Sequence, residues 1–266
     1  MALANYNNQE QPLNPSQSYQ ETVNQPTSKL LATVFGYMFV ALLVTFAVAV
    51  GTAALFFYVL FGAHTLQEVI DAFNTGNFTP PLIGYLSVLG VSFIALLIMS
   101  FVTPITLSRD KHSGWPVFII YAALMGILLS TFVLIVDLVT IAEALGITVL
   151  VFLVMFLIGH FSKVNLNPVG LIAIGLLFMM LLLGSFWFLW WWLNPGAFKV
   201  IDLVFSIIVC VLMMIITAVD AYNIRKTLER GQASRNVLLF CAFVLYSDFI
   251  TLLIRILIIL SKLKNK

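Results

Sequence analysis

The sequence has few charged residues: Asp, Glu, Lys and Arg together make up 9% of its 266 residues. In soluble globular domains roughly a quarter of the residues are charged. Hydrophobic residues instead make up 62% of the chain, and the mean hydropathy is +1.08. The scarcity of charge excludes an ordinary soluble domain and predicts a polytopic membrane protein.

Cysteine is also scarce, and the balance of charge is small. The two cysteines, Cys210 and Cys241, both lie in apolar runs, where free cysteine behaves as a small hydrophobic residue. The sequence has no CxxC motif, so it gives no support to redox chemistry or a disulfide framework. A net charge of +2 is too small to indicate a nucleic-acid partner, and we expect none.

The first 28 residues differ from the rest because they are rich in Asn, Gln, Pro and Ser. They lack a basic segment followed by an apolar stretch, so we do not expect a cleavable signal peptide. The sequence predicts a disordered polar tail at residues 1–28 and one transmembrane domain at residues 29–266.

Seven apolar stretches are long enough to cross a bilayer, which takes about 20 mostly apolar residues. They are Leu30–Leu60, Leu82–Leu107, Val117–Val136, Val139–Ile158, Val169–Leu193, Val200–Tyr222 and Val237–Leu260. Long aliphatic runs without strand punctuation indicate helices, so the expected fold class is all-α, a bundle of seven transmembrane helices. The third and fourth stretches are joined by almost nothing around Asp137, which predicts a tight hairpin.

The distribution of Lys and Arg predicts the orientation of the chain. With the N-terminus in the cytoplasm, eight basic residues fall on the inner side and four on the outer side. Low cysteine usage and the absence of eukaryotic sorting signals favour a bacterial inner membrane. The C-terminal lysines do not follow the pattern, because seven crossings place them outside. The length of the last apolar run favours a full crossing. The positive charge of the C-terminal lysines instead favours a re-entrant last segment, which would return them to the cytoplasm.

Two aspartates, Asp220 and Asp248, lie within apolar runs. A carboxylate in lipid costs a few kcal/mol or more unless it faces protein, water or an ion. Because the two acids lie on consecutive segments, a helical hairpin could bring them together, where they would share a proton and titrate as a pair. Their expected depths differ by about 10 Å, so contact requires a strong tilt or a last helix that begins outside the bilayer.

Other polar residues share helix faces with these acids. Thr217 and Asn223 accompany Asp220, and Thr251 and Arg255 accompany Asp248. Two facing polar stripes favour a water-accessible seam, so these four residues are candidates for pore or cavity lining. Glu143, about one turn into the fourth stretch, could line a polar cavity or reach the outer interface. The alternative for each aspartate is that it only pins a neighbouring helix.

Three segments carry a resemblance to a known family. They are IYAALMGILLS at residues 120–130, TAVDAYNI at 217–224 and LYSDFITLL at 245–253. The order and spacing of the last two are fairly specific. From roughly Lys29 to Lys262 the chain resembles the Bax inhibitor-1 family, also called the transmembrane Bax inhibitor motif family, and a bacterial-type member of it.

The resemblance implies a seven-helix bundle with the last helix near its centre. It also implies a pH-sensitive calcium leak gated by a hydrogen-bonded pair of aspartates, which match Asp220 and Asp248. A basic residue at the cytoplasmic end of the second helix is implied to engage the first aspartate, and Arg109 is the nearest match. Two departures are Val219, where a Tyr often precedes the first aspartate, and Arg255, a cation that would oppose calcium.

We therefore expect a proton-modulated calcium leak channel and not an enzyme. Calcium, held by the carboxylates of Asp220 and Asp248, would be the transported or bound ion, and no other cofactor is expected. The expected partners are the lipid bilayer, calcium, protons and other membrane proteins. One alternative is a non-transporting regulator that acts through membrane partners. Another is an intramembrane aspartyl protease, although Asp248 lacks the Gly-x-Gly-Asp context of that class.

Overall fold

The computed structural model describes residues 26–61, 80–107, 114–185, 195–231 and 234–264, and every regular element in these ranges is an α-helix. The helices are α2 (Thr27–Phe61), α4 (Pro80–Leu107), α5 (Trp115–Ile135), α6 (Leu138–Phe161), α7 (Asn167–Ser185), α9 (Pro195–Glu229) and α10 (Arg235–Lys264). The all-α prediction is confirmed. Most of the predicted tail at residues 1–28 lies outside the described residues. Its last two positions belong to α2, which begins at Thr27.

Six of these helices are long and apolar enough to cross a membrane, so the chain is a multi-pass membrane protein. The exception within the described ranges is α7, whose apolar stretch there is Asn167–Met180. The end of the stretch predicted at Val169–Leu193 lies outside the described residues.

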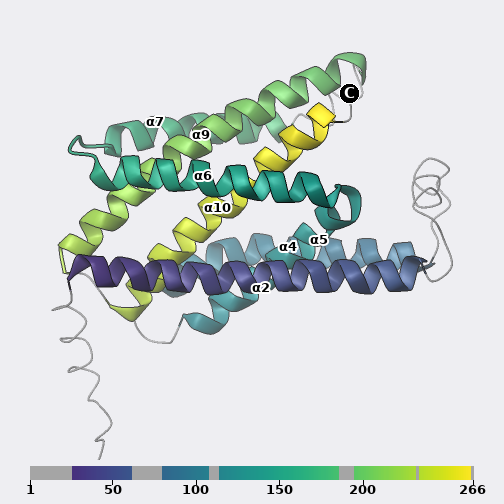
Figure 1. The fold of residues 1–266 in the computed structure, drawn as a ribbon, viewed down its shortest axis with the longest axis horizontal. Coiled ribbons are helices and arrows are strands. Elements are labelled where there is room, and N and C mark those ends of the chain that lie inside the picture. The colour runs from purple at the N-terminus through teal and green to yellow at the C-terminus, as the bar shows by residue number, and fades with distance from the viewer. Residues whose placement is uncertain (1–25, 62–79, 108–113, 186–194, 232–233, 265–266) are drawn as a thin grey trace, which may run out of the picture.

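The helices form two groups of three, with α10 between them. On one side α5 packs against α2 and α4, and on the other α9 packs against α6 and α7. Figure 1 shows α10, in yellow, running obliquely between α2 and the layer of α6 and α9. Half of the positions along α10 are buried, a larger share than in any other helix among the described residues, which confirms that the last helix lies near the centre of the bundle.

The connection between α5 and α6 corrects one expectation. It is as short as predicted, since α5 ends at Ile135 and α6 begins at Leu138, and Asp137 caps α6 by accepting a hydrogen bond from the Thr140 backbone at 3.2 Å. The two helices do not pair as a hairpin, however, because α5 packs on α2 while α6 packs on α9 and α10. This short turn therefore links the two groups of helices.

The last helix runs from one end of the bundle to the other. Gly231, with φ of 71°, forms the turn after α9, where the left-handed conformation favours glycine. At the far end of α10, Lys262 pairs with Asp202 of α9 and Lys264 pairs with Glu143 of α6. Thirty residues of helix span about 45 Å, longer than the roughly 30 Å core of a bilayer. This geometry favours the full crossing over re-entry.

Candidate functional site

The carboxyl groups of Asp220 on α9 and Asp248 on α10 lie in hydrogen-bonding contact near the middle of the bundle. Asp248 is only 5% exposed, whereas Asp220 is partly exposed. The Oδ2 atom of Asp248 is buried and meets no donor among the described residues. Ionised carboxylates are acceptors only, so a hydrogen bond between the two groups requires a proton on one of them.

The two acids meet because α9 is longer than its apolar run. The helix continues to Glu229, seven residues beyond Tyr222, and an ion pair of 3.4 Å between Arg225 and Glu229 supports this polar extension. Asp220 thus lies nine residues before the end of α9, and Asp248 lies thirteen residues after the start of α10. Their offset is four residues, about 6 Å, which a modest inclination of α10 removes.

A hydrogen-bonded tyrosine sets the position of α10 beside the pair. Tyr246, two residues before Asp248, is fully buried, and its hydroxyl lies 2.7 Å from Oγ1 of Thr45 on α2. The same Thr45 oxygen lies 3.0 Å from the carbonyl oxygen of Ala122 on α5. One polar contact therefore joins α10 to both α2 and α5, and it restricts rotation of the helix that carries Asp248.

A glycine sets the position of α9 beside the pair. A Cβ atom at Gly159 of α6 would lie 1.9 Å from the carbonyl oxygen of Ala218. Only glycine permits this approach of the α6 and α9 backbones, which occurs two residues before Asp220. Because the close contact holds α9 against α6, it also determines where Asp220 stands relative to α10.

An open groove connects Asp220 with the outside of the bundle. The groove has a volume of about 280 Å³ and lies between α7 and α9. Asp220 and two amide side chains, Asn167 and Asn223, supply its polar lining. Asp248 is not part of the lining, and Thr217, which is fully buried, contacts it from α9. Asp220 therefore stands between the groove on one side and the buried Asp248 on the other.

The comparison with protein families matches residues 27–265 to the model described as inhibitor of apoptosis-promoting Bax1. The chain belongs to this family. The match extends through all the described helices, so the family suggested by the three sequence segments is confirmed. A comparison with curated proteins finds no match. Membership of the Bax1-inhibitor family establishes the kind of membrane protein, and the chemistry of its site rests on the residues themselves.

The structure of this Bax1-inhibitor family member separates the remaining candidate residues from the pair. Thr251 donates its hydroxyl to the Ser247 carbonyl at 2.8 Å within α10. Glu143 lies 2.7 Å from Lys264, and both side chains are nearly half exposed, which favours its interface position. Arg255 lies near Cys210 and forms no hydrogen bond or ion pair within the described parts of the chain. Arg109 lies outside the described residues.

Sequence reasoning missed the residues that hold the acids in place. Tyr246 stood inside a segment that carried the family resemblance, yet its partner Thr45 is a single hydroxyl in an apolar run without a distinguishing pattern. Gly159 likewise has no local signal, because its importance comes from Ala218, which is distant in sequence. Such pairs become visible only when the helices are assembled.

Proposed function

We propose that this member of the family is a proton-regulated calcium leak channel, with Asp220 and Asp248 as its pH-sensitive gate. The observation that carries the proposal is the contact of two carboxyl groups inside the bundle. Two such groups cannot both ionise cheaply at this distance, so they share a proton and titrate as a pair. A change of pH then alters the charge at the centre of the membrane domain.

The surroundings of the pair support exchange of ions and protons with water. Asp220 lines the groove between α7 and α9, so it provides the route by which a proton reaches Asp248. Calcium takes oxygen ligands from carboxylates, amides and carbonyls, and the groove presents a carboxylate with the amides of Asn167 and Asn223. We assign Asp220 the roles of proton-exchanging member of the gate and first calcium ligand in the groove, and Asp248, which lies deeper, the role of second ion ligand.

Arg109 is the proposed latch of the closed state. Ionised Asp220 would attract its guanidinium through a charge-assisted contact, and protonation of Asp220 removes the charge that holds the latch. Calcium flux is therefore expected to rise as the pH falls. Replacement of Arg109 by Ala should raise the basal flux, and unchanged flux in the folded variant would assign the latch to another residue, with Lys111 next.

Calcium flux into proteoliposomes from about pH 5 to about pH 8 tests the gate. Asp220→Asn keeps the shape of the protonated acid, so this variant should leak more and lose most of its pH dependence. Asp248→Asn should carry less calcium. Glu143→Gln is the control, because this acid lies at the end of the bundle beside Lys264, and its pH profile should match that of the wild type.

Identical pH profiles for all four proteins would contradict the aspartate gate, and absence of calcium flux in all four would leave a non-transporting regulator as the better account. The proposed setting is a bacterial inner membrane with the N-terminus in the cytoplasm. Labelling of single introduced cysteines in intact cells tests this orientation. Lys163→Cys should be protected from a reagent that does not cross the membrane, whereas Lys264→Cys, at the opposite end of the bundle, should react. Cys210 and Cys241, both buried, would first be replaced.

A further inference from the structure

We propose that a groove bounded by α2, α6 and α10 binds one acyl chain of an anionic phospholipid. The groove has a volume of about 350 Å³ and an apolar lining. Its residues are Phe35, Met38, Val149, Phe152, Leu153, Phe156, Leu157 and Phe249. An engineered protein cavity of about 150 Å³ already holds benzene, so the space is ample for a segment of hydrocarbon chain.

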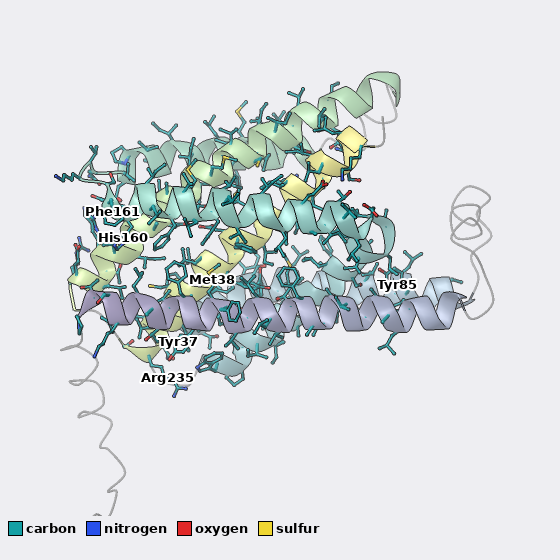
Figure 2. The ribbon with its side chains drawn as sticks, viewed as in Figure 1. Tyr37, Met38, Tyr85, His160, Phe161 and Arg235 are labelled. Atoms are coloured by element: carbon teal, nitrogen blue, oxygen red, sulfur yellow. The ribbon has the colours of Figure 1, made fainter. Side chains whose placement is uncertain are left out.

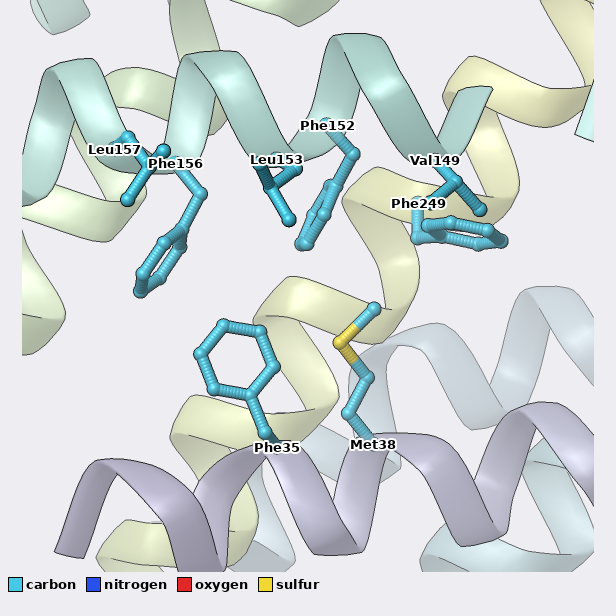
Figure 3. A pocket seen from close by; sticks show the side chains of 8 residues that line it. All are labelled: Phe35, Met38, Val149, Phe152, Leu153, Phe156, Leu157 and Phe249. Atoms are coloured by element: carbon cyan, nitrogen blue, oxygen red, sulfur yellow. The ribbon is translucent and has the colours of Figure 1, made fainter. Parts of the chain in front are cut away.

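The groove exists because its two walls belong to different helix groups. The backbones of α2 and α6 stay apart, and side chains such as Phe35 and Phe156, whose ring centroids are 4.8 Å apart, meet between them. Figure 3 shows Phe35 and Met38 pointing from α2 toward α6, with Phe249 of α10 next to Val149. The central helix is thus reached from the side of the bundle rather than from its ends.

The pattern of exposure shows that the groove opens toward lipid. Its inner residues Phe152, Phe156 and Phe249 are each no more than 6% exposed. On the rim, Leu153 is 53% exposed and Leu157 is 42% exposed, and both lie within a membrane-spanning helix. The surroundings of such a rim are the hydrocarbon chains of the bilayer, so the natural occupant is a lipid chain rather than a water-soluble ligand.

The length of the groove fits one leaflet. Its most distant lining residue on α6, Val149, lies twelve residues before the end of the helix at Phe161, a distance of about 18 Å. Half of the hydrocarbon core of a bilayer is about 15 Å. A lipid whose headgroup lies at this end of α6 would therefore place its chain along the whole groove.

Basic groups gather where that headgroup would lie. Lys29 and the N-terminus of α2 begin one wall, and Lys163 follows the end of the other wall at Phe161. Figure 2 shows His160 of α6 at the end of the bundle where α2 starts. Arg225 donates hydrogen bonds to the carbonyl groups of His160 and Ser162, which offsets the negative end of the α6 dipole. The described part of α2 has no acidic residue.

These charges decide which lipid is preferred. Hydrocarbon chains gain little by leaving other lipids for a protein surface, because both are equally apolar. The preference must come from close packing in the groove and from attraction between an anionic headgroup and basic side chains. The site is distinct from the aspartate pair, although Phe249 on its floor directly follows Asp248 in the sequence.

Retention of lipid during purification tests the proposal. Protein reconstituted with equal amounts of phosphatidylglycerol and phosphatidylcholine, with identical chains, is extracted in detergent, and bound lipid is counted by native mass spectrometry. Wild type should retain phosphatidylglycerol. Leu153→Trp, which fills the rim, should lose it, and Leu157→Trp should behave in the same way. Val154→Trp is the matched control, because Val154 is 50% exposed but does not line the groove.

The headgroup is tested separately. Replacing Lys29 or Lys163 by Gln should reduce retention of phosphatidylglycerol by about fivefold for each lysine, whereas Lys264→Gln, at the opposite end, should not. Equal retention by Leu153→Trp and Val154→Trp would overturn the site. Equal retention of the two lipids, or retention of free fatty acid in place of phospholipid, would overturn the proposed occupant. Thermal unfolding of each variant verifies that it is folded.

Discussion

The last helix meets acidic side chains at two levels, and the two contacts follow different physical rules. Near the middle of α10, the Asp248 carboxyl is buried and contacts Asp220, a group of the same kind. At the end of α10, Lys262 and Lys264 contact acids of opposite charge, and these side chains are between 26% and 45% exposed. The first contact needs a shared proton, whereas the second needs none.

In our proposal the first contact is a pH-sensitive gate, whereas the second only holds the helices together. A buried pair of like groups is stable only while a proton lies between them, so its charge depends on pH. Exposed ion pairs are screened by salt and contribute about 0–1 kcal/mol each. The first contact joins α10 to α9, and the second joins α10 to both α9 and α6. Substitutions that exchange the character of these contacts, or that move the helices that hold them, test the comparison directly.

The largest effect is expected from a lysine in the middle contact. Asp220→Lys turns the pair of acids into a pair of opposite charges like that at the end of α10. Asp248 would then stay ionised without a shared proton, and the added cation would repel calcium. We expect loss of calcium flux into proteoliposomes at every pH tested. Asp202→Asn, which alters only the exposed contact with Lys262, should keep it. Persistent pH-dependent flux in Asp220→Lys would refute the assigned gate.

A smaller effect is expected from separating the helices that hold the acids. Gly159→Ala places a Cβ against the Ala218 backbone, and overpacking of this kind costs about 1–3 kcal/mol. Thermal unfolding in detergent should show a lower midpoint temperature, and that midpoint should depend less on pH than in the wild type. Gly146→Ala on the same helix is the control, because nothing lies within 4 Å of a Cβ there. Equal midpoints would show that α6 does not position Asp220.

A further effect concerns the other charge within α10. Arg255 lies seven residues after Asp248, about 10.5 Å along the helix, and it has no ionic partner within the described residues. At that separation the charge of Arg255 raises the energy of a cation beside Asp248, and the increase corresponds to a flux change on the order of tenfold. Arg255→Gln should therefore increase calcium flux, and an unchanged flux would place the ion path away from this helix face.

The smallest effect is expected at the end of α10. Lys262→Gln combined with Lys264→Gln removes both ion pairs, and each should lower the free energy of unfolding by no more than about 1 kcal/mol. The loss should disappear at high salt, where the wild-type pairs are screened as well. Unfolding at two salt concentrations measures this, and a large loss that is independent of salt would show that the lysines act through packing.

Much of this architecture was predictable because it depends on local composition. Long apolar runs and scarce charge indicated the membrane helices, and Asp220 and Asp248 were identifiable because a carboxylate is rare in such runs. The ends of the helices were harder to predict from the sequence. The predicted apolar stretch ended at Tyr222, yet α9 continues to Glu229, since polar residues at a membrane surface are as compatible with a helix as with a loop.

The sequence by itself determined the class of protein, its family and the two acids worth attention, because each depends on residue type and spacing along the chain. Only the tertiary structure decided that the acids touch, that α5 and α6 part after their turn, and that Gly159 and Thr45 hold the neighbouring helices. These contacts join residues far apart in sequence, and their partners are selected by the packing of whole helix faces, which no local pattern encodes.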